Sequence, residues 1–210
     1  MTDLFNLHTI AFTCWQYPIS YIELLGTLFG ILSVYLASRA NILTWPTGLL
    51  NELFLFLLFF QVRLYADMVL QVFFFVTTLY GWYNWKNNRS ARQITSLAMR
   101  ERLLWACLLG MAILPAGYLF AHLHHWWPAV FPEQAAYPYA DSLVMLGSMV
   151  ATFLLARKKI ENWYCWIAVD LVATIIYWKK AIVFLSAEYL LFLLLATYGL
   201  FNWTKQQKHA

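Results

Sequence analysis

Two tryptophans and one aspartate are spaced so that their side chains share one face of a helix. Trp163, Trp166 and Asp170 stand at positions i, i+3 and i+7, a spacing that aligns side chains along a helix. Indole faces attract cations by about 0.5–2 kcal/mol each and stack on flat rings. A carboxylate adds Coulomb attraction where water competes poorly. The pattern predicts a site for a planar ligand that is cationic or electron-poor, and it disfavours an anionic ligand.

Further polar side chains interrupt apolar segments elsewhere. Glu52 and Asp170 fall near the middle of their segments, Asn162 lies near one end, and Gln71 and Glu188 lie in the outer halves. Such groups are costly at membrane depth and usually face a cavity or a partner. Hydrogen bonds that only tie helices together would explain any one of them, but two acids at equivalent repeat positions favour a site.

A third set of residues forms a stripe with a regular helical spacing. Gln71, Phe75, Thr78 and Trp82 follow i, i+4, i+7 and i+11, which places an amide, a hydroxyl and two aromatic rings on one face. Such a stripe suits a polar, aromatic ligand. Helix packing accounts for it about equally well.

The composition places the chain in lipid. The 210 residues are 62% hydrophobic, 19% aromatic and only 11% charged, whereas about 25% of a soluble protein is charged. The formal charge of +4 comes from Lys and Arg at segment ends, so it indicates membrane topology. No basic stripe is present, which argues against a nucleic-acid partner. Three widely spaced cysteines predict neither a disulfide framework nor a metal site.

Three histidines near one segment end raise the question of a metal. His122, His124 and His125 are close in sequence, but no carboxylate or thiol stands beside them. Next to Trp126 and Trp127 they fit an interfacial aromatic belt better than a metal site. The sequence therefore predicts no metal and no cofactor.

Seven segments are long and apolar enough to be membrane-spanning helices. A spanning helix needs about 20 mostly apolar residues to cross about 30 Å of hydrocarbon. The predicted spans are Tyr21–Ser38, Leu43–Phe60, Ala66–Trp85, Leu103–Ala121, Tyr139–Ala156, Ile160–Trp178 and Ala181–Trp203.

The first three spans repeat in the last three. Tyr21–Lys86 aligns without a gap on Tyr139–Thr204, 118 positions later. The matches include Tyr21/Tyr139, Arg39/Arg157, Trp45/Trp163, Tyr80/Tyr198, Gly81/Gly199, Asn84/Asn202 and Trp85/Trp203, with acids paired at Glu23/Asp141 and Glu52/Asp170. Internal repeats of this kind are typical of transporters.

The repeat is symmetric as a scaffold and asymmetric at the candidate site. Where the second copy has Trp163, Trp166 and Asp170, the first has Trp45, Gly48 and Glu52. One indole is thus replaced by a residue without a side chain. An asymmetric ligand lying between the two copies would require such a difference.

An odd number of spans per copy makes the unpaired fourth helix necessary, because a single linking span lets both copies face the same way. The expected architecture is all-α, with a 3+1+3 arrangement of two parallel three-helix repeats. The expected parts are an interfacial segment at 1–18 without a removable signal peptide, repeats at 19–86 and 139–204, a loop, linker helix and outer loop at 87–138, and a cytoplasmic tail at 205–210.

Lys and Arg positions predict the orientation. With the amino terminus outside and the carboxyl terminus cytoplasmic, eleven of the fourteen basic residues lie inside, and only Arg63, Lys179 and Lys180 lie outside. The positive-inside rule favours this topology. The inner basic residues are Arg39, Lys86, Arg89, Arg92, Arg100, Arg102, Arg157, Lys158, Lys159, Lys205 and Lys208.

Several motifs together resemble the PnuC-type vitamin transporters over nearly the whole stretch from Tyr21 to Trp203. They are Trp45-Pro46-Thr47-Gly48, Leu64-Tyr65-Ala66-Asp67, Gln71-Val72, Tyr80-Gly81-Trp82-Tyr83-Asn84-Trp85, and Arg157-Lys158-Lys159-Ile160-Glu161-Asn162-Trp163 with Trp166 and Asp170. The Trp-x-x-Trp element of the family falls on Trp163 and Trp166.

The resemblance implies a full-length relative of the SWEET sugar carriers that takes up nicotinamide riboside across the bacterial inner membrane. It further implies passive movement, trapping by cytoplasmic phosphorylation and a possible homotrimer. Relatives carry thiamine or riboflavin. The expected substrate-binding residues are Trp163, Trp166, Asn162, Asp170, Trp45, Asn51, Glu52, Gln71, Phe75, Thr78, Tyr80, Trp82, Glu188 and Tyr198.

The leading functional hypothesis is a uniporter with alternating access and no covalent chemistry. A proton-coupled carrier that uses Glu52, Asp170 or Glu188 is one alternative. An intramembrane enzyme is disfavoured, because the spans contain no nucleophile elbow, phosphate loop or His pair with acidic partners. A purely structural membrane protein would not need carboxyl groups at mid-depth.

Overall fold

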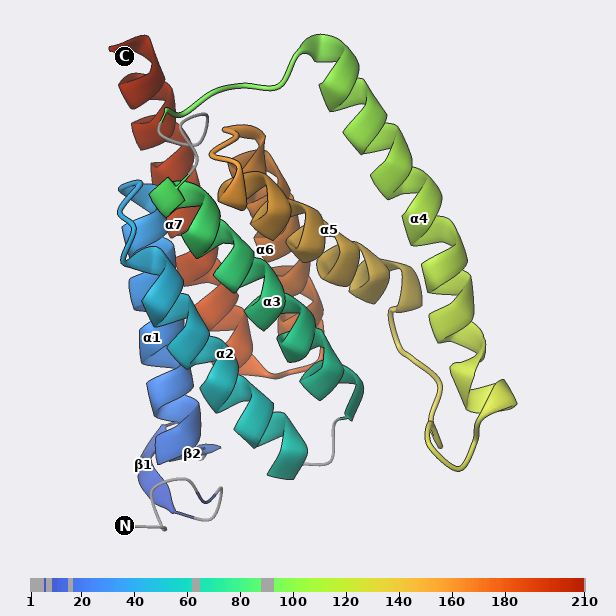
Figure 1. Cartoon of the computed structure of the whole chain (residues 1–210). Helices are drawn as coiled ribbons and strands as arrows, with labels where there is room; N and C mark the ends of the chain where they lie inside the picture. Colours follow the sequence, from blue (N-terminus) through green and yellow to red (C-terminus); the bar gives the residue numbers. More distant parts are fainter. Residues whose placement is uncertain (1–5, 7–8, 15–16, 62–64, 88–92, 210) are drawn as a thin grey trace. The chain divides into compact units, whose positions relative to one another are not determined.

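The computed structural model describes residues 6, 9–14, 17–61, 65–87 and 93–209. Apart from one small hairpin, this part of the chain is helical (Figure 1). The elements are β1 (Ile10–Cys14), β2 (Tyr17–Ser20), α1 (Tyr21–Ser38), α2 (Thr44–Gln61), α3 (Tyr65–Asn87), α4 (Met99–Trp126), α5 (Pro138–Ala156), α6 (Glu161–Lys179) and α7 (Val183–Lys208).

All seven predicted helices are present at their predicted places. α1 has the predicted bounds, and every other helix extends a residue or more beyond its predicted span at one or both ends. Three of them, α2, α6 and α7, begin one or two residues later than predicted. The largest extension is in α4, which runs from Met99 to Trp126 and keeps Pro115 inside it. The length of each apolar stretch therefore predicted where a helix lies. Some helices continue past the apolar stretch into neighbouring polar residues.

The chain divides into two compact units, Met1–Arg92 and Gln93–Ala210. We call them unit 1 and unit 2 and describe each by itself. In unit 1, α1 packs on α2 and α2 packs on α3. In unit 2, α4, α5, α6 and α7 pack in succession, each on the next. Each unit therefore contains one copy of the sequence repeat, and unit 2 also contains the linking helix α4.

Within the described ranges, four of the seven helices predicted as spans are long and apolar enough to cross a membrane: α1, α4, α5 and α7. Each of the other three carries polar residues singled out above, such as Glu52 in α2, Gln71 in α3 and Asp170 in α6. Polar side chains lower the mean hydropathy of these helices. The least apolar helices are thus those that carry most of the candidate site.

A hairpin precedes α1 and was not predicted from the sequence. β1 and β2 pair antiparallel, and the Ser20 Oγ caps α1 by accepting a hydrogen bond from Glu23 N at 3.3 Å. The hydroxyl of Tyr17 donates to Glu23 Oε1 at 2.8 Å. Burial and this carboxylate raise the pKa of Tyr17 to about 12, so the phenol stays protonated and keeps donating.

Aromatic side chains of the hairpin remain outside the core. Phe12 and Tyr17 are exposed, as expected of residues at a membrane interface. Phe5 and Trp15, two further aromatic residues of the predicted interfacial segment at 1–18, lie outside the described residues. The described residues also leave out three arginines used to predict the orientation, Arg63, Arg89 and Arg92, and Leu64 of one family motif.

The same tight turn joins the first two helices of each repeat. Ala40 has φ of 53° and Lys158 has φ of 51°, and these residues are 118 positions apart. In each turn a backbone N–H reaches back over five residues at 3.0 Å, from Asn41 to Leu36 O and from Lys159 to Leu154 O. The left-handed backbone costs a residue with a Cβ about 1 kcal/mol. The repeat therefore extends to a backbone conformation that neither residue type favours.

Candidate functional site

Trp163 stands in the first turn of α6, directly after that tight turn, and is only 1% exposed. Its ring meets Trp203 of α7 edge to face, with centroids 5.5 Å apart and planes at 88°. A Cβ added to Gly199 would lie 2.6 Å from Trp163 Cζ2. Gly199 is therefore needed for α7 to approach this indole, and the ring is held inside the packing of α6 on α7.

Unit 1 repeats this arrangement with the equivalent residues. Trp45 is 2% exposed and meets Trp85 edge to face, with centroids 5.1 Å apart and planes at 90°. A Cβ on Gly81 would overlap the Trp45 ring. In both units the indole N–H is buried and has no hydrogen-bond partner among the described residues. Because both copies pack this tryptophan in the same way, packing alone explains why it stands there.

Trp166 lies one turn further along α6, is half-buried, and has no counterpart in unit 1. The equivalent residue there is Gly48, whose added Cβ would lie 3.2 Å from Ser33 Oγ and 3.5 Å from Thr78 Cγ2. Unit 1 therefore has little room for a side chain at this position. In unit 2 the positions of Ser33 and Thr78 are taken by alanines, Ala151 and Ala196.

The two buried carboxyl groups have different surroundings. Glu52 is 8% exposed, and its Oε1 accepts a hydrogen bond from Thr78 Oγ1 at 2.5 Å. Asp170 is 3% exposed, and no hydrogen bond or ion pair of its carboxyl group is found in the described part of the chain. The reason is visible in the repeat, since Ala196 stands where Thr78 would be. A buried carboxyl without a partner is costly unless a ligand or a proton compensates it.

Two of the candidate amides already have structural contacts. Asn51 Nδ2 donates to Gly26 O at 2.8 Å and so ties α2 to α1. Asn162 Nδ2 donates to Lys159 O at 2.6 Å within the tight turn. Its Oδ1 is buried and has no partner among the described residues. Gln71 is buried on α3. Asn162 Oδ1 thus remains available to accept a hydrogen bond.

The stripe predicted on α3 is split by the fold. Gln71 and Thr78 are buried, whereas Phe75 is exposed. Tyr80 and Tyr198 are exposed as well, and Trp82 and Glu188 are half-buried. Within unit 1 the structure brings together Glu52 and Thr78, and within unit 2 it places Trp166 and Asp170 four residues apart on α6.

Two contributors to these sites were not recognised in the sequence. Ser33 closes the space beside Gly48, and Ala196 leaves Asp170 without a hydroxyl partner. The alignment at 118 positions contained the signal for the second, because it matches Thr78 with Ala196. The contact of Ser33 with Gly48 depends on packing between helices and has no signal in the sequence.

His122 on α4 makes aromatic contacts. His122 stacks on Trp126, with ring centroids 5.7 Å apart and planes at 26°, and its Nδ1 lies 2.8 Å from Tyr118 O. Within the ranges that the structure describes, no group of three or more His, Cys, Asp or Glu side chains is arranged to hold a metal ion.

Comparison with known proteins gives consistent matches over most of the chain. The family model described as nicotinamide mononucleotide transporter matches residues 20–205. The nicotinamide riboside transporter PnuC of Escherichia coli strain K12 is 32% identical over 206 residues, covering 89% of this chain and 86% of that protein. The riboflavin/roseoflavin transporter RibM of Streptomyces davaonensis is 24% identical over 202 residues, covering 94% and 91%.

A solved structure shows the same fold. The crystal structure of the vitamin B3 transporter PnuC superposes with a TM-score of 0.65 at 20% sequence identity, covering 90% of this chain and 83% of that chain. At this identity the likeness concerns the fold alone.

Proposed function

Because this chain belongs to the nicotinamide mononucleotide transporter family, we propose that it carries nicotinamide riboside across the membrane. The chain is a membrane transporter and not an enzyme. The substrate is the part we infer, and one observation carries it. Unit 2 places the Trp166 indole and the Asp170 carboxyl group, which has no partner among the described residues, on one face of α6. At the equivalent positions unit 1 has a glycine and a hydrogen-bonded carboxyl group.

Nicotinamide riboside has the chemistry that this face would recognise. Its pyridinium ring is flat and positively charged, so the Trp166 indole can stack on it and the Asp170 carboxylate can attract it. Asn162 Oδ1, which is buried without a partner among the described residues, can accept a hydrogen bond from the carboxamide or the ribose.

The other expected site residues take supporting roles in this proposal. Trp163 and Trp45 hold the starts of α6 and α2 in place through their packing on Trp203 and Trp85. Asn51 keeps α2 against α1. Phe75, Tyr80 and Trp82 of α3 and Glu188 and Tyr198 of α7, all partly or fully exposed, stay further candidate contacts within their own units.

The phosphorylated form of the substrate is disfavoured. Nicotinamide mononucleotide adds a phosphate, and its negative charge would have to approach the face of α6 that carries Asp170, which is acidic and buried. Burying a phosphate without basic partners is strongly unfavourable. We therefore expect the riboside to be carried and the mononucleotide to be rejected.

Transport by alternating access and uniport completes the proposal. It includes a 3+1+3 arrangement of two parallel repeats, as in SWEET carriers, and trapping of the product by cytoplasmic phosphorylation. It also includes location in a bacterial inner membrane with the amino terminus outside, and assembly as a homotrimer. The repeated tight turns and indole pairs support two equivalent bundles, the form of scaffold that alternating access uses.

Uptake into proteoliposomes tests the substrate. Radiolabelled nicotinamide riboside should exchange with unlabelled riboside inside the vesicles, and excess nicotinamide mononucleotide should not compete. Thiamine and riboflavin are the other competitors, because thiamine is also a flat cation and a relative of this chain carries riboflavin. If thiamine or riboflavin exchanges and the riboside does not, the substrate assignment is wrong.

Proton coupling is the second candidate, because Asp170 is buried without a partner among the described residues. Imposing a pH gradient across the vesicles separates the two mechanisms. A uniporter raises the riboside concentration inside the vesicles only to the external concentration. A proton-coupled carrier accumulates riboside above the external concentration.

A further inference from the structure

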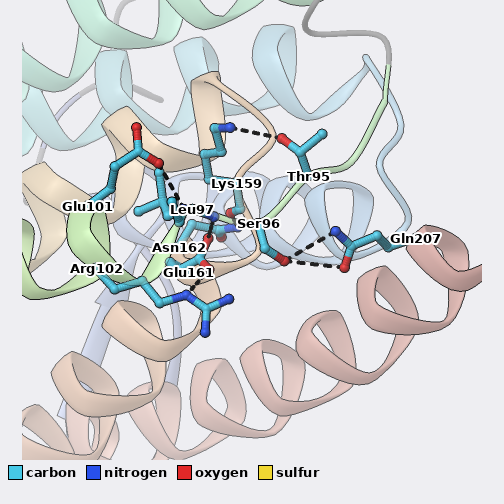
Figure 2. Close-up of polar contacts among 10 residues, drawn as sticks. Thr95, Ser96, Leu97, Glu101, Arg102, Lys159, Glu161, Asn162 and Gln207 are labelled. Atoms are coloured by element: carbon cyan, nitrogen blue, oxygen red, sulfur yellow. Dashed lines mark hydrogen bonds and ion pairs between the residues drawn. The ribbon is translucent and has the colours of Figure 1, made fainter.

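The segment Gln93–Ala98, which precedes α4, lies along the tight turn between α5 and α6. Thr95 N donates to Lys158 O at 3.1 Å, and Ile160 N donates to Thr95 O at 3.0 Å. These two bonds pair Thr95 with Lys159 as in a parallel sheet. The lysine side chain adds a third bond, from Nζ to Thr95 Oγ1 at 2.9 Å (Figure 2).

The same segment is held at two further points. Ile94 and Leu97 are buried. The Ser96 hydroxyl lies 3.2 Å from both Oε1 and Nε2 of Gln207, near the end of α7 (Figure 2). We call Gln93–Ala98 the connector, because it joins the start of α4 to the ends of α5, α6 and α7.

Glu161, the first residue of α6, contacts both the connector and α4. We call these two contacts the Glu161 fastening. Glu161 Oε2 accepts a hydrogen bond from Leu97 N at 3.1 Å, and Glu161 Oε1 lies 2.9 Å from Arg102 Nε on α4. Glu161 is buried while Arg102 is largely exposed. The carboxylate also stands in the first turn of a helix, where negative charge is stabilised. Ala98 N is satisfied separately by Glu101 Oε2 at 2.9 Å.

In the described part of unit 1, the corresponding turn is closed without contacts like those of Glu161. There Ser33 and Thr44 exchange hydrogen bonds, Ser33 Oγ to Thr44 O at 2.8 Å and Thr44 Oγ1 to Ser33 O at 2.9 Å. The residue at the position of Glu161 is Leu43. Two helices of this repeat can therefore be joined locally, and the buried carboxylate with its two partners is an addition specific to unit 2.

The addition stands directly beside the candidate substrate residues. Glu161 is followed by Asn162 and Trp163, and Trp166 lies one turn further along the helix. We propose that Glu161 is a positioning residue: by fastening the connector and α4 to the first turn of α6, it couples the connector to substrate binding. This inference rests on the function proposed above.

Thermodynamic linkage makes the inference testable from both ends. If the contacts of Glu161 with the connector and α4 favour substrate binding, substrate binding must stabilise those contacts by the same factor. Loss of the Glu161 carboxylate should therefore weaken binding, and added substrate should slow hydrogen exchange in the connector. A residue that only contributes to stability would show neither effect.

The substitutions are Glu161→Ala, Glu161→Gln and Arg102→Ala, with Arg100→Ala as the matched control. Arg100 lies in the same first turn of α4 and is exposed. Calorimetry with nicotinamide riboside should show a Kd raised about fivefold or more for Glu161→Ala. Glu161→Gln should show a smaller rise, because it can still accept from Leu97 N. Arg102→Ala should resemble Glu161→Gln, and Arg100→Ala should bind like the wild type.

Hydrogen–deuterium exchange on the wild type gives the reciprocal measurement. Nicotinamide riboside should slow amide exchange in Gln93–Ala98 and in the first turn of α6. Unchanged exchange in the connector at saturating riboside would overturn the inference, as would a Glu161→Gln variant with normal Kd and a lowered melting temperature.

A measurement without substrate separates this inference from the proposed function. Glu161→Gln should speed exchange both in Gln93–Ala98 and in residues 162–166. Faster exchange in the connector alone would overturn the coupling whatever the substrate is. If the wild type binds thiamine or riboflavin in place of the riboside, the proposed substrate is wrong, and the same exchange pattern with that vitamin would still support the coupling.

Discussion

The two sequence repeats share their scaffold and differ at their polar groups. Each begins its second helix with a buried tryptophan that packs edge to face on a second tryptophan and against a glycine. Each precedes that helix with the same left-handed turn. The differences include Trp166 for Gly48, Ala196 for Thr78 and Glu161, with its contacts to Leu97 and Arg102, for Leu43. The shared residues position the helices, and the residues that differ include those that we propose to recognise a cation in unit 2.

The shared tryptophans offer the largest expected effect. Trp163→Ala and Trp45→Ala each remove a buried indole, which should lower the free energy of unfolding by about 3–5 kcal/mol. Thermal unfolding in detergent should show similar losses for both variants. If Trp163→Ala unfolds like the wild type and only loses substrate binding, the packing role assigned to it is wrong.

Trp166 should behave in the opposite way. Trp166→Ala should weaken nicotinamide riboside binding by about 1–3 kcal/mol through lost stacking and cation attraction. Its effect on thermal unfolding should be small, because the side chain is only half-buried. Isothermal titration calorimetry measures the first and a melting curve the second. An unchanged Kd would remove Trp166 from the site.

The buried carboxyl groups allow the difference between the repeats to be transferred. Ala196→Thr should give Asp170 the hydroxyl partner that Thr78 gives Glu52, and it should weaken riboside binding because the carboxyl then has a competing contact. The free energy of riboside binding should become about 1 kcal/mol less favourable, which is the net contribution of a hydrogen bond of this kind. Ala196→Val, which adds similar bulk without a hydroxyl, is the matched control. Equal Kd values for the two variants would contradict the role of Asp170.

The left-handed turn offers the smallest effect. Ala40→Gly should raise the free energy of unfolding by up to about 1 kcal/mol, because glycine adopts φ of 53° without a Cβ clash. The melting temperature should rise by about 2–4 °C. Ala37→Gly, three residues earlier inside α1, should lower the melting temperature, because glycine is unfavourable inside a helix. A lower melting temperature for Ala40→Gly would mean that the Ala40 methyl group makes a contact worth more than the backbone cost.

The positions of the helices followed from the sequence because apolar length and aromatic belts are local properties. The bounds of α1 were predicted correctly, and the repeat predicted that Trp45 and Trp163 occupy equivalent positions. The hairpin before α1 was missed, since its few residues carry only a weak strand pattern.

The candidate site followed from the sequence less completely. The i, i+3, i+7 spacing on α6 grouped Trp163 with Trp166, yet Trp163 is buried against Trp203 and Trp166 is not. Which side of a ring is covered depends on the neighbouring helix and on Gly199, which lies 36 residues further along the chain. The Glu161 fastening was missed for the same reason, because Leu97 is brought to it only by the fold.

The most direct measurement compares nicotinamide riboside with its reduced form, whose ring is neutral and no longer aromatic. The oxidised riboside should bind the wild type at least about tenfold more tightly, equivalent to about 1.4 kcal/mol of cation attraction and stacking, and Asp170→Asn should remove most of that preference. Equal affinity of the wild type for the two forms would contradict recognition of a flat cation by Trp166 and Asp170.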